Sequence, residues 1–369
     1  MDKKNRFGSR MELQDYMKTM MSKSLSYRRA KHYDFEEASP KMYILESYHS
    51  ESTEQKYVRI LEALKKWKKA SGIKEIEPGE LVEMTVVTPR KSHFYMYLDF
   101  KFFFPSNRFI MLFSLGSSNN SDSAVSSLVD TVVFLDNVWF DNSLYKRIDE
   151  SIGQKFRAYD YKVSHSYSIF ESRSNSEKME SLSSEISKKL RQELPVYSDR
   201  FWRAGDKDYT TIEAYYHGKL VFWGEDFDFV VEKAMSLERN YNEDLTKLEG
   251  FAGKEYPNTI ESEDRQIDLS YLPEPIRIRF DQNINIQEVS SYILSGLRPF
   301  KIFGLPFEQR EGYLYSFAFD KHVGNPIGIE ITSNEISLYL YPGGCANTIK
   351  RFYRNFQEYI VSNAELYVD

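Results

Sequence analysis

The chain has 369 residues, of which 41% are hydrophobic and 28% charged, and its formal net charge is −6. This composition is typical of a globular protein and excludes a disordered chain, a collagen and a coiled-coil rod. The negative charge argues against a protein whose main role is to coat duplex nucleic acid. At roughly 100–200 residues per domain, the length indicates two or three domains.

The first 40 residues predict a loosely ordered basic arm. Residues 1–31 carry nine Lys and Arg against three Asp and Glu, so this segment has a net charge of +6. Apolar side chains would share one face of a short helix here: Leu13, Tyr16, Met17, Met20 and Met21. Two interpretations stay open, a frayed tail or a basic, Met-rich face that docks on an acidic partner, nucleic acid or a membrane surface.

Residues 41–150 predict a first folded unit. A helix is expected over 54–71, because Tyr57, Leu61 and Leu64 recur on one side and Gly72 follows. Residues 116–123 are Ser- and Asn-rich and predict a polar loop. Strands are expected at 42–48, 81–87, 93–104 and 108–115.

Residues 151–235 predict a second unit. We expect a strand over 161–171, a helix over 175–194 that ends before Pro195, and a hairpin of 209–216 with 219–223. An acidic segment follows, since residues 225–268 carry a net charge of −8. We therefore interpret 236–271 as an acidic linker or an exposed helical connection.

Residues 272–369 predict a third unit with the clearest pattern. A strand over 276–280 leads to a helix capped by Asn285, and a final helix spans 348–361. Between them, apolar residues alternate with others over 313–320, 327–332 and 336–341, which indicates an antiparallel meander with one buried face. We expect the aromatic residues of this meander to pack beneath the helices. An alternative is that Tyr313, Tyr315, Tyr339 and Tyr341 stack nucleic-acid bases.

The fold class follows from the recurring order of strand, helix and meander. Helices packed on antiparallel sheets make an α+β protein of two or three units. The units share no recognisable residue identity, so an internal duplication is only suggested.

The best local candidate for a ligand site joins the last predicted strand to the last helix. Gly343 and Gly344 precede the helix, where free backbone N–H groups and the helix dipole favour an anion. We predict ligand contacts from this turn and the helix that follows it: Gly343, Gly344, Asn347, Lys350, Arg351 and Arg354. The alternative is a tight turn followed by a solvated, basic helix face.

Two weaker candidates concern chemistry. Cys345, placed at a helix start, is a candidate nucleophile with His322 beside Asp320 as its base. Asp226 and Asp228 follow an apolar strand and are weak candidates for a divalent metal, although an acidic loop that opens a helix explains them as well. The alternative reading of Cys345 is a small buried side chain.

Cysteine usage bears on the compartment. Cys345 is the single cysteine, so no intrachain disulfide forms, and we expect a reducing, cytoplasmic setting. Neither a secretory signal nor a membrane span is expected from the sequence. No pattern identifies a cofactor.

These observations predict a non-enzymatic binding or regulatory protein that engages an acidic partner or a phosphate-bearing ligand, with nucleic acid among the possibilities. One alternative is a metal-dependent enzyme acting on nucleotides or nucleic acid. Another is a subunit of a larger protein assembly or a homo-oligomer.

Overall fold

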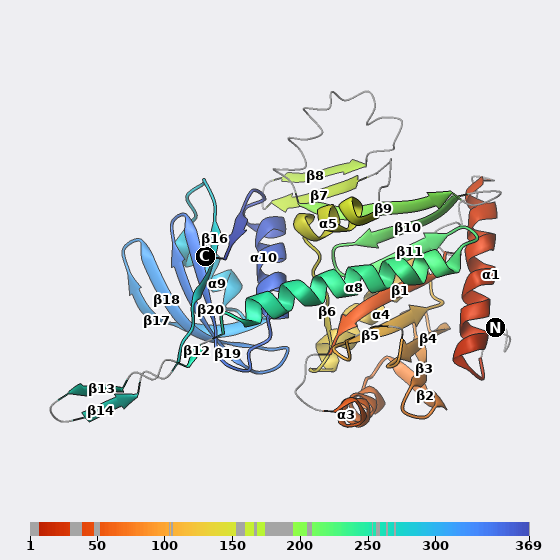
Figure 1. The fold of residues 1–369 in the computed structure, drawn as a ribbon, viewed down its shortest axis with the longest axis horizontal. Coiled ribbons are helices and arrows are strands. Elements are labelled where there is room, and N and C mark those ends of the chain that lie inside the picture. The colour runs from red at the N-terminus through yellow and green to blue at the C-terminus, as the bar shows by residue number, and fades with distance from the viewer. Residues whose placement is uncertain are drawn as a thin grey trace. The chain divides into compact units, whose positions relative to one another are not determined.

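The structure is a computed structural model, shown in Figure 1. It describes residues 7–29, 39–47, 52–102, 104, 106–152, 159–165, 168–173, 195–204, 209–252, 254–255, 259–262, 265–268 and 271–368. Contacts divide the chain into two compact units. Unit 1 is Met1–Asp160, Ser174–Met179 and Tyr197–Asn240; unit 2 is Tyr161–Arg173, Glu180–Val196 and Tyr241–Asp369.

Unit 1 is built on an antiparallel sheet whose strands run in the order β2-β3-β4-β5-β1-β11-β10-β9, with β6 paired to β1. The elements in chain order are α1 (Arg10–Arg29), β1 (Lys41–Glu46), α3 (Thr53–Lys65), β2 (Ala70–Glu77), β3 (Leu81–Val87), β4 (His93–Asp99), β5 (Phe109–Ser114), α4 (Ser118–Thr131), β6 (Asp136–Asn137), α5 (Asn142–Ile152), β9 (Val196–Ala204), β10 (Tyr209–Tyr215), β11 (Lys219–Trp223) and α8 (Phe227–Glu249). Val196 at the start of β9 and the residues of α8 from Tyr241 onward belong to unit 2. Two further strands are β7 (Tyr159–His165) and β8 (Ser168–Arg173).

Helices α3 and α4 cover one face of this sheet. Their apolar stripes pack on alternate residues of β1 and β3–β5, and Ile60, Leu64 and Leu128 are fully or almost fully buried there. Helix α3 starts where the Ser52 and Gln55 side chains each accept the other's backbone N–H. The apolar spacing that the sequence predicts thus serves one shared core.

Two expectations for unit 1 differ from the structure. Helix α3 ends at Lys65 rather than Ser71, and Ala70–Glu77 forms strand β2. This strand lies at the sheet edge with much of its side-chain surface exposed, so it lacks the apolar alternation that marks buried strands. The predicted polar loop, residues 116–123, instead forms the start of helix α4. Ser117 caps this helix, and its side chain accepts from the Asn120 N–H.

The part of the N-terminal arm that the structure describes, residues 7–29, contains a docked helix. Leu13, Met17 and Met21, spaced by four residues, are completely buried on one side of α1. The Phe7 ring lies 5.5 Å from that of Tyr97 on β4, and the Gly224 N–H after β11 donates to the Met21 carbonyl. The arm is therefore part of unit 1, and α1 covers the sheet face opposite α3 and α4.

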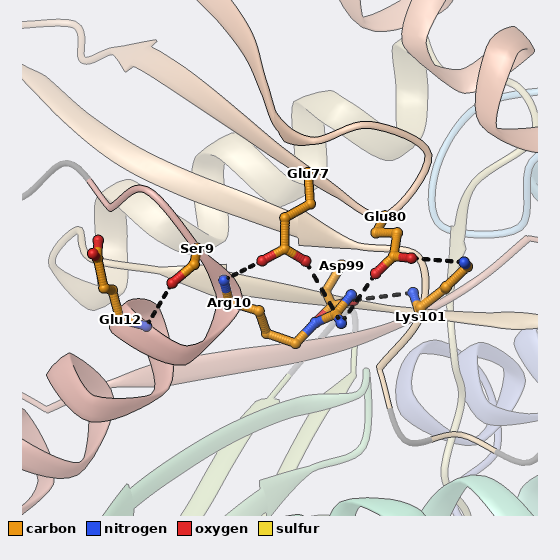
Figure 2. A network of polar contacts seen from close by, with 7 residues as sticks. All are labelled: Ser9, Arg10, Glu12, Glu77, Glu80, Asp99 and Lys101. Atoms are coloured by element: carbon orange, nitrogen blue, oxygen red, sulfur yellow. Dashed lines mark hydrogen bonds and ion pairs between the residues drawn. The ribbon is translucent and has the colours of Figure 1, made fainter.

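A cluster of carboxylates fixes the start of α1 (Figure 2). The Arg10 guanidinium donates to both oxygens of Asp99 at 2.8 and 2.9 Å and lies 3.3 Å from Glu80, while the Arg10 backbone N–H donates to Glu77. The Asp99 carboxylate is buried, and burial raises its pKa while Arg10 opposes that shift. The sequence predicts the charge of this arm but not the carboxylates that receive it.

Unit 2 contains a second antiparallel sheet with the order β17-β18-β19-β20-β16-β21. Its helices and strands are β16 (Pro275–Arg279), α9 (Ile286–Ile293), β17 (Ile302–Arg310), β18 (Tyr313–Asp320), β19 (Pro326–Thr332), β20 (Glu335–Leu340), α10 (Asn347–Tyr359) and β21 (Glu365–Tyr367). The short strands β12 (Lys254–Glu255) and β15 (Tyr271–Leu272) pair, as do β13 (Thr259–Ser262) and β14 (Arg265–Asp268).

Five strands of each sheet share one topology. In unit 1 the chain runs β1, α3, the meander β2–β5 and α4, with β1 beside β5. In unit 2 it runs β16, α9, the meander β17–β20 and α10, with β16 beside β20. The order of strand, helix and meander that the sequence predicts more than once therefore occurs in both units.

The segment 236–271, expected to be an acidic linker or an exposed helical connection, begins as the second half of a helix and continues into the short strands β12–β15. Helix α8 runs from Phe227 to Glu249, and Leu237, Tyr241 and Leu245 on it are buried. Their four-residue spacing gives the helix an apolar stripe despite its many charges.

The predicted fold class is confirmed: the described chain is α+β, with helices packed on antiparallel sheets. The predicted domain boundaries stay a prediction, although strands from 41–150 and 151–235 share one sheet through the pairing of β1 with β11. The predicted helix over 175–194 lies outside the described residues.

Removing the Arg10 side chain tests how α1 is held. We expect Arg10→Ala to lower the free energy of unfolding by about 2 kcal/mol, because it leaves the buried Asp99 carboxylate without its cation. Urea denaturation measures this, and limited proteolysis should cut α1 faster. The matched control is Lys18→Ala, since Lys18 is half-exposed and lies 3.8 Å from exposed Asp15. Equal stabilities of the two variants would contradict the assignment.

Glu238 on α8 makes the free energy of unfolding of unit 1 depend on pH. Its side chain is fully buried, and burial raises the pKa of its carboxyl from 4.5 to about 7, against the opposing charge of Arg239. The folded state therefore binds a proton more tightly than the unfolded state.

We expect stability from this group to be complete below about pH 4.5 and lost as the pH rises through about 7. Glu238→Gln should flatten that part of the profile and raise the free energy of unfolding at pH 8 by roughly 1–3 kcal/mol. Denaturation at a series of pH values measures both. If Glu238→Gln instead lowers the free energy of unfolding at pH 8, the ionised carboxylate stabilises the fold and this prediction is wrong.

Candidate interaction surface

The predicted anion site at the start of α10 is filled by the protein itself. The Ala346 N–H donates to the Glu249 carboxylate at 3.2 Å, and the Thr348 and Ile349 N–H groups donate to the carbonyls of Cys345 and Ala346. Gly343 sits in a turn with φ of 77°, and its carbonyl accepts from the Asn325 side chain. The amides that would hold an anion have internal acceptors.

The predicted cationic ligands are buried and point to different partners. Lys350 donates to Asp244 at 2.9 Å, Arg351 binds Asp320 and the Phe300 carbonyl, and Arg354 donates to the Val196 carbonyl at 3.1 Å. Each is at most 4% exposed, so they are not the solvated face considered above. Asn347 accepts from the Tyr241 hydroxyl. The anion prediction stays untested, and these contacts do not support it.

The structure does bring Cys345 and His322 together. The sulfur and a ring nitrogen lie within 4.8 Å of each other, as expected if the meander folds back onto the helix start. Both are buried at 1% and 2% exposure, and the Asp320 carboxylate is used by Arg351 and Thr348. Burial disfavours the thiolate that a nucleophile requires and closes the sulfur off from a substrate, so these positions do not support nucleophilic catalysis.

Asp226 and Asp228 do not converge. Asp226 accepts from the Phe229 N–H at 2.9 Å, which caps α8, and it lies 3.3 Å from Arg203. Asp228 is exposed in the first turn of α8. These positions agree with the alternative interpretation, an acidic loop that precedes the first turn of a helix.

A different feature of unit 2 stands out. One side of its sheet packs on α9 and α10, and the other side exposes a group of large apolar side chains. We name this second side the aromatic face. Its exposed members are Phe303, Leu305, Phe307, Phe317 and Phe319, at 55%, 73%, 82%, 42% and 47%, and half-buried Tyr313, Tyr315, Tyr339 and Tyr341 complete it.

The expectation that these aromatic residues lie beneath the helices is wrong for β18. The buried side of that strand carries Leu314, Ser316, Ala318 and Asp320 instead. Asp320 must face inward to reach Arg351, and Gly304 on β17 lies so close to Ala318 that a Cβ would come within 2.6 Å. The side of β18 that is buried therefore carries small or charged side chains at three of its four positions.

The aromatic face is ordered by contacts among its own side chains. The Phe317 ring lies 5.6 Å from Phe319 and 5.7 Å from Tyr341, both edge to face, and Phe307 lies 6.3 Å from Tyr315. Gly328 lies between Phe317 and Tyr339, and a Cβ there would come within 3.1 Å of Tyr339. The rings therefore form one continuous surface.

Hydroxyl groups add a polar centre to this face. Tyr313 and Tyr339 both donate to the Glu330 carboxylate, the former at 3.0 Å. Burial and the neighbouring Glu330 raise the pKa of Tyr339 and Tyr313, so both stay protonated and donate at neutral pH.

Three of the five exposed members of this face lie on a strand that the sequence pattern does not predict. Strand β17, with Phe303, Leu305 and Phe307, was not predicted, although its residues 302–307 are almost all apolar. Pro306 interrupts the pattern, and a bulge between Pro306 and Glu308 shifts its register. The alternation of residue types along β18 is visible in the sequence, but it does not indicate which side of the strand packs on the helices.

Comparison with known proteins bears on the whole chain. A model of the MJECL33-like protein family matches residues 1–369. The chain belongs to this family. It is 31% identical over 170 residues to a protein named MJECL33 from Methanocaldococcus jannaschii, an alignment that covers 44% of this chain and 38% of that protein.

The family and relative carry no stated activity in their names, and no solved structure matches the chain. Within the described residues, no helix has both the length and the apolarity that crossing a bilayer requires. The surface of unit 2 thus has to be interpreted from its own geometry.

Breaking the ion pair between Arg351 and Asp320 tests how much it contributes to the stability of unit 2. We expect Arg351→Met to lower its free energy of unfolding by about 3–5 kcal/mol, because both groups are fully buried and Asp320 would lose its cation. Arg279→Met is the control, since Arg279 lies 2.7 Å from Glu335 but is half-exposed, and it should cost about 0–1 kcal/mol. Chemical denaturation measures both. A mild effect at Arg351 would contradict a structural role.

Proposed function

We propose that this protein is a cytoplasmic, non-enzymatic binding protein that acts as a component of a protein assembly, and that the aromatic face of unit 2 is its contact surface. The exposure of five large apolar side chains on one sheet face is the observation that carries the proposal. Exposed apolar side chains scattered singly are normal, whereas a contiguous group marks an interaction site.

The size of the surface suits a protein partner. With about 200 Å² for each large side chain, the five most exposed residues leave on the order of 600 Å² in contact with water. A standard protein interface buries roughly 800 Å² on each partner, and the four half-buried tyrosines supply part of the difference. Tyrosine and phenylalanine are also enriched where interfaces are buried most deeply.

The predicted phosphate-bearing ligand has less support than a protein. Lys350, Arg351 and Arg354, its predicted contacts, already hold carboxylates and carbonyls of the chain. The aromatic face has mixed charge, because Glu330 lies on it and the Arg310 guanidinium lies 4.7 Å from the centre of the Tyr313 ring. Its exposed side chains are mostly apolar, which suits a protein partner better than a phosphate or a nucleic-acid backbone.

Site-specific cross-linking tests the proposal. A photoreactive phenylalanine replaces Phe307, and the protein is irradiated in the cells that make it naturally. We expect a cross-linked product of defined mass that disappears when Leu305→Asp is added, because the charge disrupts the apolar contact.

The matched control carries the same photoreactive residue at Val133, which is 48% exposed in unit 1. Leu305→Asp should leave the free energy of unfolding within about 0.5 kcal/mol of the parent, since Leu305 is 73% exposed. Equal yields at positions 307 and 133 would mean that the aromatic face contacts no partner.

A further inference from the structure

The shared topology lets the two sheets be compared strand by strand. Strands β2, β3 and β4 of unit 1 correspond to β17, β18 and β19 of unit 2, each set starting from the sheet edge. The helices correspond as well: α3 and α9 each follow the first strand, and α4 and α10 each follow the meander. The face of unit 1 opposite α3 and α4 therefore corresponds to the aromatic face of unit 2.

In unit 1 this face is covered by amphipathic helices: α1 crosses the part that carries Tyr97, and α8 packs on Phe222 and Phe201 of β11 and β9. The buried stripe of α1, Leu13, Met17 and Met21, lies on the side of the sheet that carries Tyr97. Beneath it, the Tyr97 hydroxyl donates to the Glu83 carboxylate at 2.8 Å, and both residues are buried. Unit 1 thus shows what kind of element such a face accepts.

The polar pair beneath the helix has a counterpart in unit 2. Glu83 on β3 lies opposite Tyr97 on β4, and Tyr315 on β18 lies opposite Glu330 on β19. The tyrosine and the glutamate exchange strands, and the hydroxyls that donate to Glu330 come from Tyr313 and Tyr339 rather than from Tyr315. Both sheets still place on this face a carboxylate that accepts a tyrosine hydroxyl.

The charge at one end of the face also corresponds. In unit 1 the β2–β3 hairpin carries Glu77 and Glu80, which receive Arg10 at the start of α1 (Figure 2). In unit 2 the β17–β18 hairpin carries exposed Glu308 and Glu311 with the single cation Arg310. Acidic groups there complement the positive end of a helix dipole and a basic first turn.

The sheet edge next to this face is poorly suited to a strand. Pro306 on the edge strand β17 has no N–H, and the bulge beside it breaks the register of hydrogen bonds. Added strands need a regular row of backbone groups. An occupant therefore lies on the face rather than along the edge.

We propose that the aromatic face binds an amphipathic helix of a partner protein, with an apolar stripe of four-residue spacing and a basic residue in its first turn. The helix starts near Glu308 and Glu311 and lays its stripe over Leu305, Phe307 and Phe317. This inference rests on the proposed function and names the chemistry of the partner.

A peptide of residues 7–29 of this chain is the probe, because it contains a helix of this chemistry. Labelled peptide is titrated with the full chain, and fluorescence anisotropy reports binding. We expect saturable binding that weakens at least about tenfold in Leu305→Asp/Phe307→Asp. Glu308→Lys/Glu311→Lys should weaken it about three- to tenfold and reduce its dependence on salt.

Two controls locate the binding. Val133→Asp in the full chain should leave the affinity unchanged, since Val133 is an exposed apolar residue of unit 1. A peptide with Met17→Glu should lose binding because its stripe is interrupted. Unchanged melting temperatures establish that the aspartate variants are folded.

Binding that survives Leu305→Asp/Phe307→Asp, or no binding of the peptide to the parent chain, would overturn the helix proposal. Sedimentation separates this from failure of the proposed function. A dimer that forms without peptide binding and is lost in Leu305→Asp/Phe307→Asp would assign the face to a second copy and leave the proposed function standing. Absence of the cross-link at position 307 would remove the proposed function as well.

Discussion

An antiparallel sheet has two faces, and each apolar face has to be removed from water. This constraint organises both units. In unit 1, α3 and α4 cover one face, and α1 docks on the other through Leu13, Met17 and Met21. In unit 2, α9 and α10 cover one face, while Phe303, Leu305 and Phe307 remain exposed on the other. The functional interpretation depends on this difference between two sheets of the same topology.

Charge follows a second rule in both units: the cations at the starts of α1 and α10 are placed against acceptors of their own unit. Arg10 binds the carboxylates at one end of the unit 1 sheet, and Lys350 and Arg351 bind Asp244 and Asp320 in unit 2. Desolvating an ion is costly unless it is paired and hydrogen-bonded. Clusters of basic residues that look available for a ligand in the sequence therefore fix helices in the folded chain.

The recurrence of topology gives the aromatic face an internal reference. Because α1 precedes β1 in the chain, unit 1 supplies its own covering helix. The described segments that precede β16 are the end of α8 and the short paired strands β12–β15, and the large apolar side chains of the face stay exposed. A protein that covers one such face internally and leaves the other open is suited to bind a helix from another chain.

The sequence by itself determined the α+β class, most strands of the meanders, the Asn285 cap and the stripe of α10, because these depend on local periodicity and capping. The sequence allowed His322 to approach Cys345 only if the meander folded back, and the structure places their side-chain atoms within 4.8 Å. Edge strands β2 and β17 were missed, since exposure and Pro306 remove the alternation that marks a strand. Only the tertiary structure decided that Lys350 and Arg351 are buried, that Arg10 meets Asp99, and that Phe317 faces outward. Each of these depends on partners 30 or more residues away, or on which side of a strand the helices occupy, and alternation along a single strand is the same whichever side is covered.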